Sequence, residues 1–259
     1  MAIRAKKSLG QHFLKDEHIA RSIVESIKPT EAGKVLEIGP GMGVLTKYLL
    51  EHQEYETSVI ELDRDSVAYL KKKYPQLEDR IIEGDFLQLD LANLFSQTPF
   101  SVIGNFPYNI SSQIFFKVLE TKDLIPEVVC MLQEEVALRI CSGPGSKVYG
   151  ILSVFLQAWY KTEYLFNVSP HVFDPPPKVQ SAVIRLTRNG VTELGCNEKL
   201  FRKVVKQAFG QRRKMLRNSI KLFSPRIEEL DAVLLTRRPE QLTVSEFVNL
   251  TNDIEKLMA

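Results

Sequence analysis

The heptapeptide Glu37-Ile38-Gly39-Pro40-Gly41-Met42-Gly43 decides the fold of this chain. It begins within the apolar run Val35–Ile38, which is typical of a buried strand, and it precedes a helical pattern over 44–50. Its alternating glycines let the backbone turn sharply and approach a ligand closely. Glu61 ends the next apolar run, 22 residues after Gly39, a spacing at which a carboxylate can accept both hydroxyls of a ribose. The stretch predicts a βαβ unit that binds a cofactor containing a ribose.

Alternating segments extend this unit along the chain. Apolar runs at 35–38, 58–62, 100–104 and 128–132 alternate with helical patterns at 44–50, 66–73, 111–119 and 134–141. The alternation predicts an α/β fold, a Rossmann-like and mostly parallel sheet with flanking helices. The runs 164–168 and 182–187 have no helix between them, so we expect them to add an antiparallel edge.

The two ends of the chain are expected to be helical. Asp16 can cap a helix before Pro29, and Thr243 with Glu246 has the spacing of a capping box that opens the last helix. The strand pattern stops near residue 189, and an apolar helical face follows at 200–209. We therefore predict a cofactor-binding domain at 1–190 and a small all-helical domain at 191–259.

Composition places the chain among globular proteins. It has 259 residues, of which 44% are hydrophobic and 25% charged, and its longest apolar runs are well short of a membrane helix. The three cysteines are widely spaced, which favours a reducing compartment and argues against a structural zinc. We expect a cytoplasmic protein with no membrane segment and no metal.

The glycine loop and the segment around Asp85 narrow the class of cofactor further. A dinucleotide-binding loop needs Gly or Ala at position 44, where the chain has Val44, so NAD is disfavoured. S-adenosylmethionine has no pyrophosphate and tolerates the larger residue. Asp85, in the segment Gly84-Asp85-Phe86 between the runs 58–62 and 100–104, adds a carboxylate for the adenine amino group, with Phe86 against the ring. A simple glycine-rich turn between strand and helix is the alternative.

The segment Asn105-Phe106-Pro107-Tyr108 directly follows the predicted strand at 100–104, at whose carboxyl end an open α/β sheet places its ligands. The Asn105 side-chain oxygen and the Phe106 carbonyl could accept the two hydrogens of an adenine amine and favour the charge that develops on its nitrogen. Pro107 fixes the turn, and Tyr108 offers a ring on which a base can stack. The alternative is an ordinary turn with Tyr108 in the core.

An extruded base needs a second aromatic face. Phe173, just before the stiff run Pro175-Pro176-Pro177, is the candidate, and its alternative role is a core anchor for that loop.

Basic residues are concentrated in two segments. Residues 199–221 contain nine and the first fifteen residues contain four, with no acid in either segment. The net charge is only +2, so the remainder has 11 more acidic than basic residues. Such segregation favours contact with a phosphate backbone over a solvated helix face. The predicted RNA-binding residues are Arg4, Lys6, Lys7, Arg212, Arg213, Lys214 and Arg217.

Six motifs carry a resemblance that spans nearly the whole chain. They are 8–14, 37–41, 59–63, 105–111, the proline-containing stretch 173–181, and 211–219 with its sequence Gln211-Arg212-Arg213-Lys214. With them the chain resembles the ribosomal RNA adenine N6,N6-dimethyltransferases, specifically the enzyme that dimethylates two adjacent adenines in the 3′-terminal hairpin of small-subunit (16S) rRNA.

The resemblance implies a class I methyltransferase sheet, S-adenosylmethionine as cofactor, and a monomer that acts on small-subunit rRNA in the immature 30S subunit. It implies a cofactor site lined by His12, Leu14, Gly39, Glu61, Asp85 and Asn105. Two positions depart from the family, which usually has Asn at His12 and Leu at Phe106.

Other functions remain open from the sequence. An erythromycin-resistance methyltransferase performs the same chemistry on large-subunit RNA, but the proline run and 211–219 resemble the small-subunit branch. A small-subunit assembly factor that needs no catalysis is a second alternative, and an NAD oxidoreductase is a third.

Overall fold

The computed structural model describes residues 5–6, 9–28 and 33–258. Two predicted RNA-binding residues, Arg4 and Lys7, lie outside the described residues. The strands are β1 Phe13–Leu14, β2 Lys34–Ile38, β3 Glu56–Glu61, β4 Ile81–Glu83, β5 Ser101–Asn105, β6 Glu127–Gln133, β7 Tyr160–Val168, β8 Phe173–Asp174 and β9 Ser181–Arg188. The helices are α1 Glu17–Glu25, α2 Val44–Leu49, α3 Arg64–Lys73, α4 Leu91–Leu94, α5 Ser111–Glu120, α6 Glu134–Cys141, α7 Ile151–Gln157, α8 Glu198–Gly210, α9 Leu216–Ser219, α10 Ala232–Thr236 and α11 Val244–Met258.

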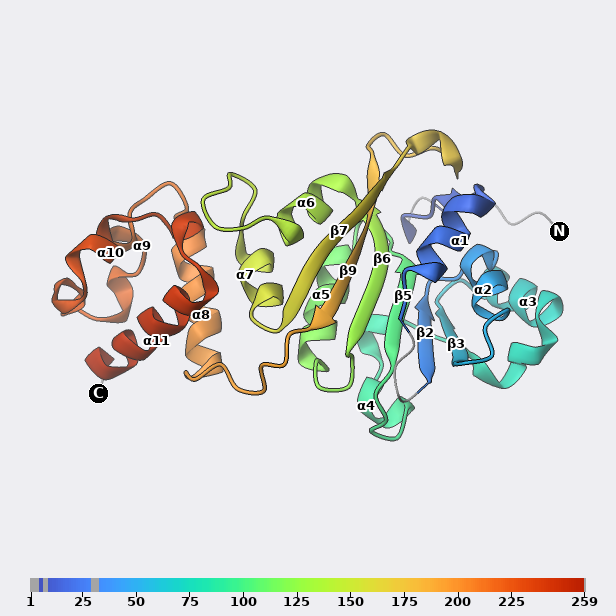
Figure 1. The fold of residues 1–259 in the computed structure, drawn as a ribbon, viewed down its shortest axis with the longest axis horizontal. Coiled ribbons are helices and arrows are strands. Elements are labelled where there is room, and N and C mark those ends of the chain that lie inside the picture. The colour runs from blue at the N-terminus through green and yellow to red at the C-terminus, as the bar shows by residue number, and fades with distance from the viewer. Residues whose placement is uncertain (1–4, 7–8, 29–32, 259) are drawn as a thin grey trace. The chain divides into compact units, whose positions relative to one another are not determined.

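The predicted sheet is confirmed. Seven strands are ordered β4-β3-β2-β5-β6-β9-β7 (Figure 1). The pairs β4·β3, β3·β2, β2·β5 and β5·β6 are parallel, while β6 and β9 are antiparallel. The late runs therefore form the non-parallel side of the sheet, as expected, with β7 at its edge.

Both faces of the central strands are buried, as parallel sheets require. Val35, Ile103 and Val129, on three neighbouring strands, pack in one core cluster with the apolar sides of α1 and α2. The alternate residues Leu36 and Val102 face the other way and are equally buried. Helices thus cover both faces of the sheet, and the carboxyl ends of the strands are left to build a site.

A small second sheet ties the N-terminal segment to the proline-containing stretch. Strands β1 and β8 are antiparallel, with Phe13 opposite Asp174 and Leu14 opposite Phe173. The sequence pattern did not single out this sheet, because each strand has only two residues and shows no period. The pairing of β1 with β8 brings His12 into contact with Pro175.

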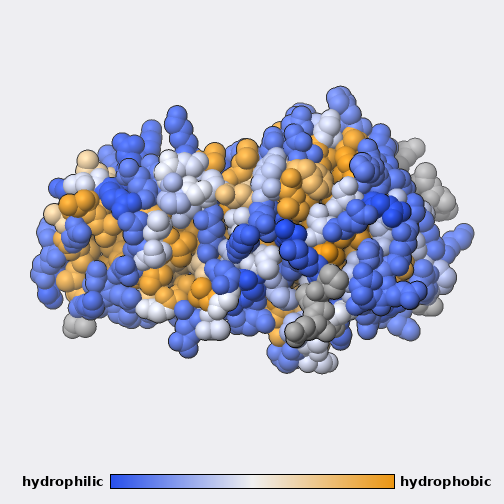
Figure 2. Space-filling model, in the orientation of Figure 1, coloured by the Kyte–Doolittle hydropathy of each residue, from blue (hydrophilic) through white to orange (hydrophobic). Residues whose placement is uncertain are grey.

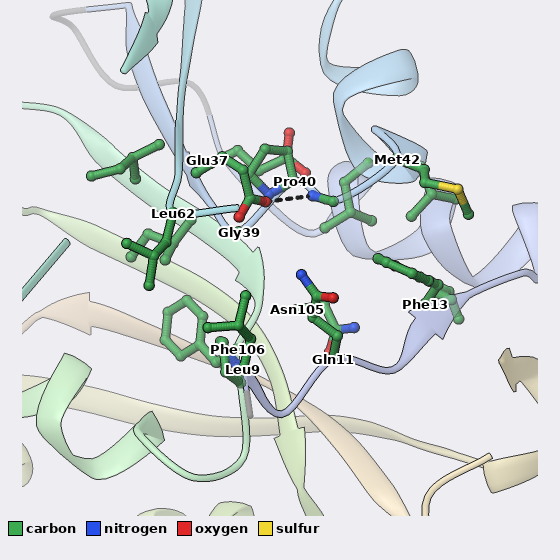
Figure 3. Close-up of a pocket in the computed structure, with 18 of the residues that line it drawn as sticks. Leu9, Gln11, Phe13, Glu37, Gly39, Pro40, Met42, Leu62, Asn105 and Phe106 are labelled. Carbon is green, nitrogen blue, oxygen red and sulfur yellow. Dashed lines mark hydrogen bonds between the residues drawn. The ribbon is translucent and has the colours of Figure 1, made fainter. Parts of the chain in front are cut away.

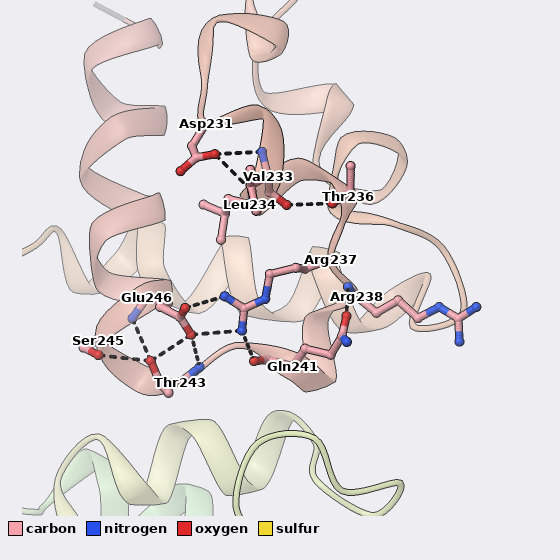
Figure 4. Close-up of polar contacts among 10 residues, drawn as sticks. All are labelled: Asp231, Val233, Leu234, Thr236, Arg237, Arg238, Gln241, Thr243, Ser245 and Glu246. Atoms are coloured by element: carbon pink, nitrogen blue, oxygen red, sulfur yellow. Dashed lines mark hydrogen bonds and ion pairs between the residues drawn. The ribbon is translucent and has the colours of Figure 1, made fainter.

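The two helix caps expected at the ends of the chain are confirmed. The Asp16 side chain accepts hydrogen bonds from the backbone N–H groups of His18 and Ile19 at the start of α1. The Thr243 hydroxyl accepts from the Glu246 N–H, and the Glu246 carboxylate accepts from the Thr243 N–H at 2.8 Å (Figure 4). Arg237 adds an ion pair to Glu246, which secures the entry to α11.

The contacts of the chain define two compact units, which depart in one respect from the expected division at 190/191. One comprises the described residues up to Ala137 together with Thr162–Arg188. The other comprises Leu138–Lys161 and the described residues from Asn189 onward. Residues 138–161 join the second unit because Phe155 of α7 packs near Phe201 of α8, and Tyr149 near Phe209. These contacts link residues about 50 positions apart, so local patterns do not reveal them.

The surface of the protein combines hydrophilic and apolar regions. Figure 2 shows hydrophilic side chains over much of one face, with apolar patches between them. Within the described residues, no helix is long and apolar enough to cross a membrane.

Gly104 lies where β5 approaches β2 closely. A Cβ at this position would lie 2.5 Å from the backbone carbonyl oxygen of Ile38, which cannot move without disturbing the sheet. We expect Gly104→Ala to lower the free energy of unfolding by about 1–3 kcal/mol, the usual cost of overpacking. Urea denaturation measures it. Gly84→Ala is the matched control, because a Cβ there meets nothing within 4 Å. Equal stability of the two variants would contradict the close approach.

Candidate cofactor and methyl-transfer site

One pocket of about 560 Å³ lies at the carboxyl ends of β2, β3 and β5. This volume is within the range of small-molecule sites. Figure 3 shows Glu37, Gly39 and Pro40 on one side of the pocket and Asn105 and Phe106 on the other. Residues 9–15 of the N-terminal segment complete the wall. The pocket is lined by every predicted cofactor residue, His12, Leu14, Gly39, Glu61, Asp85 and Asn105, and also by Phe106, Pro107 and Tyr108.

The glycine loop is open toward the pocket at its first glycine. Gly39 has φ of +65°, and a Cβ built on it meets nothing within 4 Å, so a ligand could approach its backbone closely. Gly41 has φ of +56°, and a Cβ there would meet the Phe13 ring at 2.9 Å. The loop therefore needs glycine at both positions, once for access and once for packing.

Glu61 is held rigidly at the end of β3. Its carboxylate accepts hydrogen bonds from the backbone N–H of Gly41 at 3.0 Å and of Asp63 at 2.9 Å. Burial raises its pKa, although these hydrogen bonds partly oppose the shift. One bond to each oxygen leaves further lone pairs toward the pocket. That geometry fits a carboxylate that receives two ribose hydroxyls.

Asp85 and two apolar side chains form the part of the pocket suited to a base. One Asp85 oxygen accepts from the Leu87 N–H at 2.9 Å, and none of the described residues donates a hydrogen bond to the other. Phe86 is buried, while Leu62 lines the pocket with 53% of its surface exposed. Leu62 was not predicted as a pocket residue, and its place directly after Glu61 is the only sequence signal for it.

The Asn105 amide has a defined orientation. Its Nδ2 donates to the backbone carbonyl of His12 at 3.0 Å, so its Oδ1 is the atom left to accept. The Phe106 N–H donates to the Met131 carbonyl at 2.9 Å, and no described residue donates to the Phe106 carbonyl. Asn105 and Phe106 thus provide two acceptors at the end of β5.

Tyr108 contacts two other segments of the chain. Its ring stacks on His12 with ring centres 5.4 Å apart, and its hydroxyl hydrogen-bonds to the Ser181 hydroxyl at 2.5 Å. His12 Nδ1 lies 2.7 Å from the Pro175 carbonyl. A carbonyl only accepts, so Nδ1 carries the proton of this hydrogen bond.

The structure corrects the assignment of Phe173 as the second stacking face. Its side chain is 1% exposed, belongs to the core cluster of the sheet, and does not line the pocket. The ring is drawn into the core because β8 pairs with β1 beside α1. As placed here, Phe173 anchors the proline-containing stretch and cannot cover a base.

Two predicted RNA-binding residues are used within the protein. The Lys6 ammonium pairs with Asp63 at 2.5 Å and with Asp65 at 2.7 Å. Arg212 donates to the backbone carbonyls of Ser146 and Lys147. These contacts fix the N-terminal segment and the 143–148 loop. Two carboxylates balance the Lys6 charge, and Arg212 Nε lies 3.9 Å from a Glu240 carboxylate oxygen.

The other three predicted RNA-binding residues are placed differently. Arg213 and Lys214 are exposed, and neither has an acidic partner within the described part of the chain. Arg217 is partly buried, and its Nε has no hydrogen-bond partner among the described residues. Lys199, Lys203 and Lys206 extend this exposed basic surface along one side of α8.

Glu37 is a pocket residue that the sequence analysis did not assign. Its carboxyl is 1% exposed and accepts a hydrogen bond from the Thr46 hydroxyl at 2.5 Å. Burial raises its pKa to about 8, so the carboxyl is mostly protonated at neutral pH. The signal for it in the sequence was a charged residue inside an otherwise apolar strand.

Solved structures with a similar fold define the class. A dimethyladenosine transferase from Plasmodium falciparum superposes with a TM-score of 0.80 at 24% identity, covering 95% of this chain and 98% of the other. The 23S rRNA methyltransferase ErmE gives a TM-score of 0.67 at 25% identity, covering 92% and 99%. The fold is that of a class I methyltransferase.

Sequence relatives then give the family. The family model for ribosomal RNA adenine dimethylase matches residues 2–256. A Ribosomal RNA small subunit methyltransferase A from Bacteroides thetaiotaomicron is 57% identical, over 99% of this chain and 96% of the relative. A protein of the same name from Porphyromonas gingivalis is 55% identical, over 97% and 98%. This chain belongs to the ribosomal RNA adenine dimethylase family, which makes it an S-adenosylmethionine-dependent rRNA adenine dimethyltransferase.

The raised pKa of Glu37 makes stability depend on pH. The carboxyl keeps its proton in the folded state up to about pH 8 and loses it in the unfolded state near 4.5. Between these values the folded state binds more protons, so its contribution to stability falls as pH rises, by up to ~1.4 kcal/mol per pH unit. We expect Glu37→Gln to remove this slope, as measured by urea unfolding from pH 5 to 8.

The control for this measurement is Glu56→Gln, which changes the same charge at an exposed position on β3. If the free energy of unfolding of Glu37→Gln falls with pH as steeply as that of the parent protein, the carboxyl at position 37 is not protonated in the folded state.

Proposed function

We propose that this chain dimethylates the N6 amines of two adjacent adenines in the 3′-terminal hairpin of small-subunit (16S) rRNA. The observation that carries the proposal is the pair of acceptors at the end of β5, the oriented Asn105 side chain and the free Phe106 carbonyl. They lie in the same pocket as the carboxylates of Glu61 and Asp85. The name of the relatives at 55–58% identity supports the small subunit as substrate.

The proposed chemistry follows from these residues. Bound S-adenosylmethionine supplies an electrophilic methyl group on a sulfonium. The lone pair of an adenine amine is delocalised into the ring, so the amine is a poor nucleophile. Asn105 Oδ1 and the Phe106 carbonyl would each accept one N–H, turn the nitrogen lone pair toward the methyl group and stabilise the developing positive charge. As the N–CH3 bond forms, the S–CH3 bond would break with its electron pair kept by sulfur, and the nitrogen would then lose one proton to water. Tyr108 would carry the base, and Pro107 would fix the turn between them.

In this proposal the cofactor is held by the six pocket residues predicted from the sequence. Glu61 would receive the ribose hydroxyls, and Asp85 the adenine amino group. Gly39 would give the ligand access to the loop backbone, where a Cβ would otherwise stand in the open pocket. His12, Leu14 and Asn105 would close the methyl-donor end. The two bonds that fix Glu61 support its part, because they orient the carboxylate before any ligand binds.

We assign RNA contact to the second compact unit and catalysis to the first. Arg213, Lys214 and the basic side of α8 would contact the phosphate backbone of the immature 30S subunit. We further propose a monomer that acts in the cytoplasm. The wide spacing of the three cysteines along the chain supports a reducing compartment.

The rival functions fit less well. ErmE, a 23S rRNA methyltransferase, is 25% identical to this chain, whereas the small-subunit relatives are above 50%. A purely structural assembly factor would have no need of an oriented amide and a free carbonyl in a pocket of this size.

Replacing Asn105 separates catalysis from binding. We expect Asn105→Ala to lower methyl incorporation into undermethylated small subunits by about 100-fold or more, as for loss of one preorganised transition-state partner. Subunit binding, measured by cosedimentation, should stay within about twofold, since phosphate contacts supply it. Asn93→Ala on α4 is the control, because the Asn93 side chain bonds to Asp90 and lies outside the pocket. Equal losses of binding and transfer would argue against a distinct chemical role for Asn105.

The basic residues are tested by the salt dependence of subunit binding. Arg213→Gln with Lys214→Gln removes two exposed charges, so the slope of log K against log salt should fall by about 2. Unfolding stability should not change. Arg212→Gln is the comparison, and we expect it to lower stability instead, because Arg212 holds the 143–148 loop. An unchanged salt slope in the double variant would refute the assignment.

A further inference from the structure

The stretch from Pro175 to Ser181 is linked to Tyr108 at both of its ends, through His12 at its start and directly at its end. Near the start of the stretch, the Pro175 carbonyl binds His12 Nδ1 at 2.7 Å, and the His12 ring stacks on Tyr108 with an angle of 28° between the planes. At its end, the Ser181 hydroxyl bonds to the Tyr108 hydroxyl at 2.5 Å. The sequence predicted neither contact; in this part of the chain it predicted only that Phe173, just before the prolines, would stack on the base.

Ser181 is a firm anchor for the phenol. It is completely buried and is the first residue of β9, where it pairs with Gln133 at the carboxyl end of β6. The Gln180 carbonyl also accepts from the Glu134 N–H at 3.0 Å. Because the backbone is fixed on both sides of Ser181, its hydroxyl marks a fixed point for the tip of Tyr108.

The His12 ring covers one face of Tyr108. Its position is set by the pairing of β1 with β8 immediately after it in the chain, and by its bond to Pro175. With its tip bonded and one face packed, the tyrosine ring is held in one rotamer. An immobilised ring loses little further entropy when a base stacks on it.

We infer that Ser181 is a positioning residue for methyl transfer, which holds Tyr108 through its hydroxyl so that the target adenine stacks on the ring face opposite His12. This inference rests on the proposed role of Tyr108 as the base platform. Ser181 does not line the pocket, so it acts through Tyr108 and not on the cofactor. The buried Phe173 takes no part in it.

A double-mutant cycle tests this role. We expect Tyr108→Phe and Ser181→Ala each to lower kcat for methylation of undermethylated small subunits by about 3- to 10-fold, the effect of one net hydrogen bond. The double variant should be no slower than either single variant, because both remove the same bond. KM for the subunit and the affinity for S-adenosylmethionine should stay within about twofold. Ser181→Thr, which keeps the hydroxyl, should recover most of the rate.

Multiplying losses in the double variant, or an unchanged kcat in Ser181→Ala, would overturn the inference. A purely structural role in β9 would also give additive losses, and Ser181→Ala would then lower the free energy of unfolding in both backgrounds. The cycle is run on whichever RNA the parent enzyme labels. Label in large-subunit RNA would refute the proposed substrate. The coupling of the two substitutions in kcat would still show whether Ser181 positions Tyr108.

Discussion

The parallel pairing of β2 with β3 on one side and β5 on the other is the constraint on which this site depends. Its register places Ile38 opposite Ile60 and Glu37 opposite Ile103, so the three strands end at one edge. The glycine loop, Glu61 and Asn105 leave those ends and line one pocket. The pairing is close because Gly104 has no side chain against the Ile38 carbonyl. Cofactor groups and chemical groups therefore come from neighbouring strands of a rigid sheet.

Segments from outside the sheet then orient those groups. The backbone of His12 fixes the Asn105 amide, and its side chain packs on Tyr108. His12 is itself held by the two-residue pairing of β1 with β8 and by Pro175. This arrangement accounts for the departure from the usual Asn at position 12, since the backbone carbonyl acts whatever the side chain. The imidazole adds a stacking surface that an Asn would lack.

The features that depend on local sequence pattern could be predicted from the sequence. Strand and helix order, the caps at Asp16 and Thr243, and the pocket positions of Gly39, Glu61, Asp85 and Asn105 all follow from periodicity, glycine placement and spacing. It did not reveal contacts between distant segments. The core position of Phe173, the ion pairs of Lys6, the carbonyl contacts of Arg212 and the union of residues 138–161 with the C-terminal helices all depend on tertiary packing. A basic residue in a sequence shows its charge but not whether a carboxylate or carbonyl already engages it.

We propose that this pocket presents an extruded adenine of small-subunit rRNA to the methyl donor. The most direct measurement incubates the protein with labelled S-adenosylmethionine and undermethylated small subunits, and then maps the modified bases. We expect two methyl groups on the N6 atom of each of two adjacent adenines in the 3′-terminal hairpin. Label at other positions, in large-subunit RNA or nowhere would contradict it.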